Sequence, residues 1–124
     1  MDIHRPLAGQ KALITGGSGE IGRAIAVALG AQGAEVLFTY FSNHDGADQT
    51  RSQLEAVGAQ SHVCRSHLGK ANAVSTLLAE AREHLGKVDI LVHNAASGVL
   101  KPFEELTPKH WDWTHTINAR AFFF

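Results

Sequence analysis

The chain has 124 residues, of which 44% are hydrophobic and 19% are charged, and its formal net charge is −1. This composition is typical of a soluble globular domain, and the balanced charge argues against nucleic acid or an anionic membrane as a partner. The single cysteine, Cys64, excludes an intrachain disulfide and suits a reducing compartment. The first ten residues have no apolar signal core, and no apolar run reaches bilayer length, so we expect a cytoplasmic protein.

Short apolar runs alternate with segments of helical periodicity along the chain. Strands are predicted at residues 11–15, 34–40, 61–65 and 88–92. Helices are predicted from Glu20 to about Gly33, over residues 49–57, from Ala73 to Gly86, and from Pro108 through Ile117. The strands are nearly continuous in hydrophobicity, which indicates a parallel sheet covered by helices on both faces. The order β-α-β-α-β-α-β-α therefore predicts an α/β fold, the first half of a Rossmann-type doubly wound parallel sheet, in one domain over residues 1–124.

Ligands of such sheets bind beyond the carboxyl ends of the strands, which here are followed by loops at residues 16–19, 40–43, 66–68 and 93–99. The stretch "TGGSGEIG", residues 15–22, lies between a predicted strand and a predicted helix. In that context a glycine-rich loop holds a diphosphate against the free N–H groups of the helix, although a plain strand-to-helix turn is the alternative. Glu20 adds a carboxylate, which we expect to face solvent or a cation, since turned inward it would weaken phosphate binding.

This loop resembles the T-G-x-x-x-G-x-G motif of the short-chain dehydrogenase/reductase family. Thr15, Gly16 and Gly22 match the motif, whereas Glu20 takes the place of the middle glycine and Gly19 lies one position earlier. The resemblance to the family extends over nearly the whole chain.

Two further segments carry the same resemblance. "DILVHNAAS" is similar to the family's N-N-A-G segment, with Asn94 and Ala95 matching and with His93 and Ala96 replacing the other two residues. "TINARAFFF" resembles the helix that carries a catalytic-site asparagine, which maps to Asn118. Without the resemblance, Asn94 would be interpreted as a strand-end turn residue and Asn118 as an exposed helix residue.

The resemblance implies a nicotinamide dinucleotide as cofactor. Tyr40 stands where an acid would bond the ribose hydroxyls and repel a 2′-phosphate, so the absence of an acid favours NADP (NADPH) over NAD. Ser42 stands where a basic residue is usual, and His67 replaces an aspartate that contacts adenine in the family. The cofactor-binding residues implied are Gly16, Ser18, Gly19, Glu20, Ile21, Gly22, Tyr40, Ser42, His67, Leu68, Asn94, Ala95 and Ala96.

Residues 93–123 are most similar to the enoyl-[acyl-carrier-protein] reductase III type of this family. That similarity implies hydride delivery to a 2-enoyl thioester on acyl carrier protein, in fatty acid synthesis, by a homo-oligomer that is tetrameric in relatives. Two alternatives stay open: a reductase of 3-oxoacyl or other carbonyl groups, and a non-catalytic nucleotide-binding module or split subunit.

The family's chemistry requires a tyrosine and a lysine, helped by a serine, and none of these three maps onto this chain. The single tyrosine, Tyr40, lies in the second predicted strand, and no lysine follows it until Lys70. Asn118 is therefore the only catalytic residue that the resemblance implies here, and we expect binding without turnover. We favour a truncated sequence over a genuine half-domain, and we expect residues 122–124 to form an exposed apolar patch.

No metal site is predicted, because the eight histidines lie on unrelated elements. Trp111 and Trp113 point in different directions on a helix, so one is expected to pack on the sheet and the other to serve a subunit contact. Cys64 is interpreted as a small core residue and not as a nucleophile.

Overall fold

The computed structural model describes residues 4–124, and residues 1–3 of the stretch predicted to lack a signal core lie outside it. Four parallel strands form one sheet in the order β3-β2-β1-β4. The strands are β1 (Lys11–Thr15), β2 (Glu35–Tyr40), β3 (Ser61–Arg65) and β4 (Ile90–His93). The helices are α1 (Glu20–Ala31), α2 (His44–Ala56), α3 (Ala73–Leu85), a 3₁₀ turn (Phe103–Glu105), α4 (Pro108–His115), a π-helical segment (Thr116–Arg120) and α5 (Ala121–Phe123). The predicted Rossmann-type α/β fold is confirmed.

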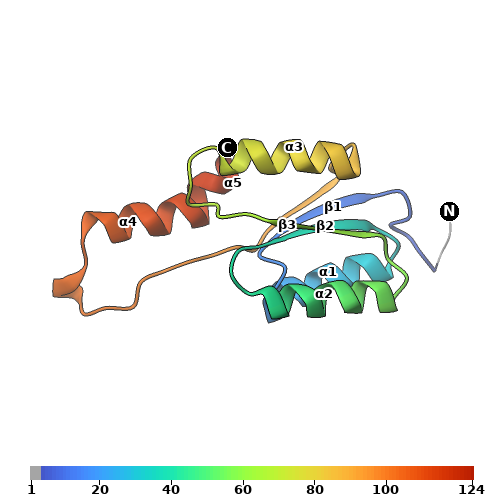
Figure 1. The fold of residues 1–124 in the computed structure, drawn as a ribbon, viewed down its shortest axis with the longest axis horizontal. Helices are drawn as coiled ribbons and strands as arrows, with labels where there is room; N and C mark the ends of the chain where they lie inside the picture. Colours follow the sequence, from blue (N-terminus) through green and yellow to red (C-terminus); the bar gives the residue numbers. More distant parts are fainter. Residues whose placement is uncertain (1–3) are drawn as a thin grey trace.

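The central residues of β1 and β2 are apolar because the two faces of these strands fill two separate cores. Figure 1 shows α1 and α2 on one side of the sheet and α3 on the other, with α4 extending away from the sheet. The two cores include Ala12, Ile14, Val36, Phe38 and Leu54 on the α1–α2 side, and Leu13, Leu37, Cys64, Leu77 and Leu85 on the α3 side. Because both faces of these strands are packed in a core, we expect functional side chains in the loops at the strand ends.

The second helix begins five residues earlier than predicted, at His44 and not at residue 49. The Asn43 side chain caps it, accepting a hydrogen bond from the Gly46 N–H at 3.0 Å, and Asp45 adds a favourable charge to the first turn. The sequence prediction was wrong here because these polar residues and Gly46 resemble a loop. The early start brings the amino end of α2 against the glycine-rich loop.

Other boundaries differ less, except in the last helix. β2 begins one residue later than predicted, at Glu35, and β4 runs over Ile90–His93 in place of 88–92. The helix predicted from Pro108 through Ile117 is α-helical only to His115, after which the chain continues as the π-helical segment. Such segments insert one extra residue into a helical turn, and the apolar spacing does not reveal them.

The surface agrees with one prediction made from the end of the sequence. Phe122, Phe123 and Phe124 are 58%, 81% and 67% exposed, as expected for an apolar patch.

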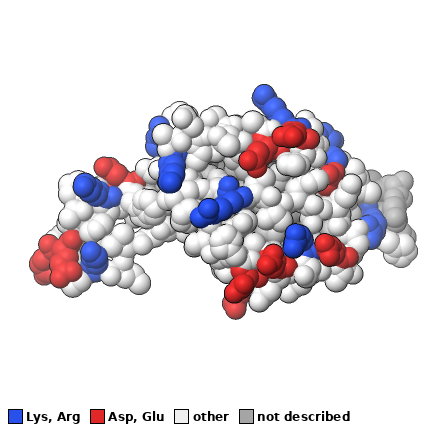
Figure 2. Space-filling model, viewed as in Figure 1, with Lys and Arg blue, Asp and Glu red and all other residues white. Residues whose placement is uncertain are grey.

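Positive and negative side chains are interspersed on the face shown in Figure 2. Within residues 4–124, no helix combines the length and the apolarity needed to cross a bilayer.

Glu35, at the amino end of β2, links three strands. Its carboxylate forms an ion pair with Lys11 of β1 and lies 2.8 Å from Nε2 of His62 in β3. Burial raises the pKa of Glu35, but the hydrogen bonds and charges of Lys11 and His62 outweigh burial, so its pKa lies below its usual range. The ionised form is therefore stabilised by folding.

We expect Glu35→Gln to lower the free energy of unfolding at neutral pH by about 1 kcal/mol, because it removes the charge from both contacts. A pKa lowered on folding stabilises the protein above the unfolded-state pKa, and this contribution disappears as the pH falls through the folded-state pKa. The difference between wild type and variant should thus vanish in acid. Urea unfolding curves from neutral to acidic pH measure it, and a difference that stays constant on acidification would contradict this assignment.

Candidate functional site

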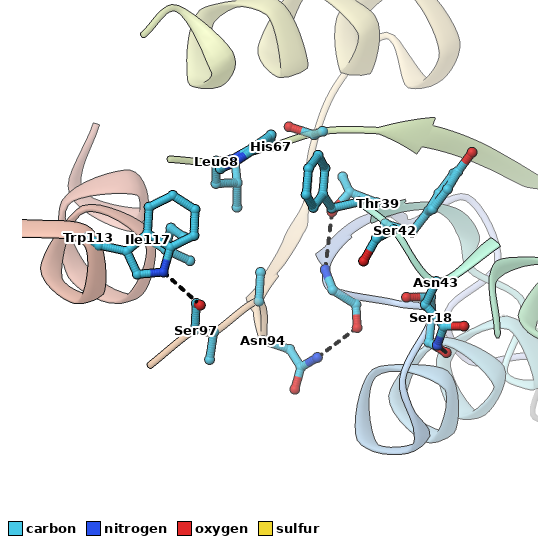
Figure 3. A pocket seen from close by; sticks show the side chains of 16 residues that line it. Ser18, Thr39, Ser42, Asn43, His67, Leu68, Asn94, Ser97, Trp113 and Ile117 are labelled. Carbon is cyan, nitrogen blue, oxygen red and sulfur yellow. Dashed lines mark hydrogen bonds between the residues drawn. The ribbon is translucent and has the colours of Figure 1, made fainter. Parts of the chain in front are cut away.

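A cleft of about 430 Å³ opens at the carboxyl ends of the four strands. Its walls come from the loops that follow β1, β2, β3 and β4, and from one side of the helix after β4 (Figure 3). The parallel order places these loops at one edge of the sheet, as the sequence predicted.

The glycine-rich loop after β1 is packed too closely for side chains at three positions, Gly16, Gly17 and Gly22. Gly16 has a φ of +71°, and a Cβ there would lie 2.8 Å from the Ala95 Cα. A Cβ on Gly22 would lie 2.1 Å from the Gly16 carbonyl oxygen. Gly19, by contrast, has an extended conformation and open space around it. The matching glycines therefore have a structural requirement, and the displaced one does not.

Side chains from α1 and α2 hold the loop in place. The buried Thr50 hydroxyl donates to the Gly17 carbonyl at 2.7 Å and accepts from Nε of Arg23 at 3.1 Å. Both Arg23 and Asn43 donate to the Ser18 carbonyl, at 2.8 and 3.2 Å. The carbonyl groups of Gly17 and Ser18 therefore accept hydrogen bonds from the α2 side. The first backbone N–H groups of α1 have no acceptor within the helix, because no helical turn precedes them. This arrangement leaves N–H groups for an anion.

The floor of the cleft is fixed by one hydroxyl. Thr15, at the end of β1, is 4% exposed, and its oxygen accepts from the backbone N–H groups of Asn94 and Ala95, both at 3.1 Å. Its proton is directed to Nδ1 of His93 at 2.9 Å, while Nε2 of His93 lies 3.1 Å from the Ile117 carbonyl. A carbonyl only accepts, so a neutral His93 carries its hydrogen on Nε2. The histidine thus ties both strand ends to the π-helical segment.

Aromatic rings line the cleft opposite the glycine-rich loop (Figure 3). The centre of the His67 ring lies 4.3 Å from the centre of the Phe41 ring. It lies 5.2 Å from the centre of the Trp113 ring, and these two rings meet edge to face. The Gly69 N–H donates to Nδ1 of His67, which leaves Nε2 as the donor of the neutral ring. Trp113 donates from Nε1 to Oγ of Ser97 at 2.9 Å. This end of the cleft can hold a flat heteroaromatic group by stacking.

Most of the predicted cofactor residues meet in the cleft. Those lining it are Gly16, Ser18, Tyr40, Ser42, His67, Leu68, Asn94, Ala95 and Ala96. Gly19, just before α1, and Glu20 and Ile21, on its first turn, are exposed, whereas Gly22 is buried behind the loop. Glu20 thus faces solvent, as expected from the sequence. Asn118 lies outside the cleft lining, and its side chain bonds the N–H and the carbonyl of Ser97 at 2.8 and 2.9 Å.

Seven further residues line the cleft: Thr39, Phe41, Asn43, Ser66, Ser97, Trp113 and Ile117. Four of these lie in the loops after the strands, so the expected topology could have included them. Trp113 and Ile117 lie outside these loops, on the helix after β4, so the expected topology did not point to them. The expectation that one tryptophan packs on the sheet was wrong in detail, because Trp113 packs on the loops beyond the strand ends, while Trp111 is 67% exposed.

Other reactive groups lie elsewhere. Burial, reinforced by Glu80, raises the pKa of Cys64 to about 12, which agrees with its interpretation as a core residue. Among residues 4–124, no three histidine, cysteine or acidic side chains are grouped so as to hold a metal ion.

Comparison with known proteins identifies the family. Residues 10–124 match the family model described as short chain dehydrogenase. The chain belongs to this family. The matched range contains the glycine-rich loop, the floor of the cleft and the helix with Asn118, which are the three segments on which the sequence resemblance rested.

Two curated proteins and one solved structure illustrate the similarity of this chain to known short-chain dehydrogenases. It is 37% identical to the hydroxynaphthalene reductase-like protein Arp2 of Metarhizium acridum, covering 99% of this chain and 46% of the relative. It is 36% identical to versicolorin reductase 1 of Aspergillus parasiticus, covering 99% and 47%. The structure of landomycin C-6 ketoreductase LanV with bound NADP and rabelomycin matches with a TM-score of 0.87 at 36% identity, covering 96% and 51%. The chain therefore spans about half the length of these relatives.

Proposed function

We propose that the chain binds NADP(H) and forms the cofactor-binding part of a carbonyl reductase. The observation that carries this proposal is the cleft at the carboxyl ends of the parallel strands, with a glycine-rich loop whose Gly16 and Gly22 leave no room for a Cβ. Such a loop lets the backbone approach a diphosphate closely. The match to a structure that holds NADP supports the same cofactor.

The lining residues fit a dinucleotide from end to end. The loop at residues 16–22 and the amino end of α1 would hold the diphosphate. Tyr40, Ser42, His67 and Leu68 would surround the adenosine, with the His67 Nε2–H as a donor. Residues 94–96 would form the floor. When bound, NADPH supplies a hydride for reduction of the substrate.

A carbonyl substrate is better supported than an enoyl thioester. The three relatives described above are named as a hydroxynaphthalene reductase-like protein, a versicolorin reductase and a ketoreductase, and none is named as an enoyl reductase. We therefore propose a ketone on an aromatic ring system as the substrate class, in place of a thioester on acyl carrier protein. The similarity of residues 93–123 to the enoyl reductase III type does not decide the substrate, because these residues position the cofactor cleft and the loop at Ser97.

The proposed reduction also needs a proton donor for the developing alkoxide. The only tyrosine, Tyr40, lies on β2, and the centre of its ring lies 5.1 Å from the centre of the His44 ring. We propose that Asn118 acts as a positioning residue, because both ends of its amide are bonded to the backbone of Ser97. We propose that Tyr40, at the adenosine end of the cleft, is not the proton donor for the developing alkoxide.

Titration of the 124-residue chain with NADPH, followed by nicotinamide fluorescence, tests the proposal. We expect saturable binding, and no consumption of NADPH when a bicyclic aromatic ketone or a crotonyl thioester is added. Absence of dinucleotide binding by the folded chain would refute the proposed function. Turnover of the thioester would restore the enoyl reductase hypothesis. Turnover of the ketone would show that the proton donor lies within this chain.

A further inference from the structure

The side chains at the end of β2 decide which dinucleotide such a fold prefers. In nicotinamide-binding sheets, an acid there bonds the ribose 2′-hydroxyl, whereas a nearby arginine accommodates a 2′-phosphate. This position holds Tyr40, and its partner across the β2–β3 ladder is Arg65, the last residue of β3. Neighbouring strands lie about 4.8 Å apart, so Arg65 begins beside the expected ribose position.

Arg65 is fixed by two contacts with Phe41, a residue that lines the cleft. Its Nε donates to the Phe41 carbonyl at 2.8 Å, and its guanidinium carbon lies 5.3 Å from the centre of the Phe41 ring. These contacts use Nε and one face of the guanidinium group. The terminal nitrogens remain for another acceptor, and the side chain is exposed.

Two arginines, Arg51 and Arg65, lie near this position, and of the two only Arg51 is close to a carboxylate of the described residues. Arg65 shares a hollow with Tyr40, His44, Asp48 and Arg51 that adjoins the cleft at Tyr40. Arg51 lies 3.5 Å from the carboxylate of Asp48. In the part of the chain that the structure describes, no carboxylate lies within 4.0 Å of Arg65.

We infer that Arg65 determines specificity for the 2′-phosphate of NADP(H), an inference that rests on the proposed function. A phosphate monoester carries nearly two negative charges at neutral pH, and a guanidinium group donates two parallel hydrogen bonds to such an anion. The charge that the sequence lacks at Ser42 is thus supplied from the neighbouring strand.

The test compares the dissociation constants of NADPH and NADH, which differ only in the 2′-phosphate, for wild type and three variants of the 124-residue chain. Arg65→Gln should weaken NADPH binding roughly tenfold and leave NADH binding within about twofold, as expected for loss of one exposed charged contact. Arg65→Lys should be intermediate, because it retains the charge but loses the planar fork. Arg82→Gln, an equal loss of charge in the last turn of α3, should change neither constant.

The outcomes separate this inference from the proposed function. If the wild-type chain binds NADH as tightly as NADPH, or if Arg65→Gln affects both dinucleotides equally, the inference fails while dinucleotide binding stands. If wild type binds neither dinucleotide, the proposed function fails and the inference fails with it. A selective loss of NADPH binding in Arg65→Gln, with Arg82→Gln unchanged, supports both.

Discussion

Replacing Gly22 with alanine is expected to destabilise the protein by at least about 3 kcal/mol and to abolish dinucleotide binding. The new Cβ would lie 2.1 Å from the Gly16 carbonyl oxygen and 2.8 Å from Nδ2 of Asn94. These two atoms are hydrogen-bonded to each other at 2.8 Å (Figure 3), so the methyl group would also break the link between the loop and the floor of the cleft. Chemical denaturation and NADPH titration measure the two effects.

Gly19→Ala is the matched control, because it adds the same methyl group three residues away on the same loop. Gly19 has a φ of −84°, and nothing lies within 4 Å of an added Cβ. As the residue that precedes the first helical position, it should tolerate alanine at a cost of about 0.5 kcal/mol. Equal destabilisation by both substitutions would show that the loop does not pack as described.

Thr15→Val should have the second largest effect, a loss of about 3 kcal/mol in the free energy of unfolding together with weaker NADPH binding. Valine retains the shape of threonine but removes the oxygen that accepts from Asn94 and Ala95 and the proton given to His93. The part-buried N–H groups of the floor would then lose their partners. Thr15→Ser keeps the hydroxyl and should retain most of the stability and affinity. If valine and serine behave alike in urea unfolding, the hydroxyl does not organise the floor.

The fold was predictable from the sequence because its main signals are local and strong. The strands predicted at residues 11–15 and 61–65 match the bounds of β1 and β3, and Gly86 ended α3 where expected. The start of α2 was missed because the cap at Asn43 depends on a side-chain hydrogen bond to Gly46, which composition does not reveal. Local propensity also gives no sign of the π-helical segment, which lies inside a continuous helical run.

The site was predictable only as far as the strand order determines it. Loops after parallel strands must meet at one edge, so most residues assigned from the family motifs do line the cleft. Contacts between distant segments could not be predicted from the sequence. Trp113 reaches the cleft from the helix predicted over residues 108–117, and Arg65 lies beside Tyr40 through strand pairing. His93 was noted as a replacement for an asparagine, but its bond to the Ile117 carbonyl required the three-dimensional structure.

The strand order also has a consequence for the order of folding. Lys11 and Glu35, which pair β1 with β2, are 24 positions apart, whereas Thr15 and His93, which pair β1 with β4, are 78 apart. Closing the longer loop costs about 1 kcal/mol more in chain entropy, so β4 should join a sheet that β1, β2 and β3 have already formed. Because β4 delivers the floor of the cleft, the binding surface is completed in the final step. A dinucleotide that bridges the glycine-rich loop and this floor would bind only the chain with β4 docked, and would thereby hold the last strand in place.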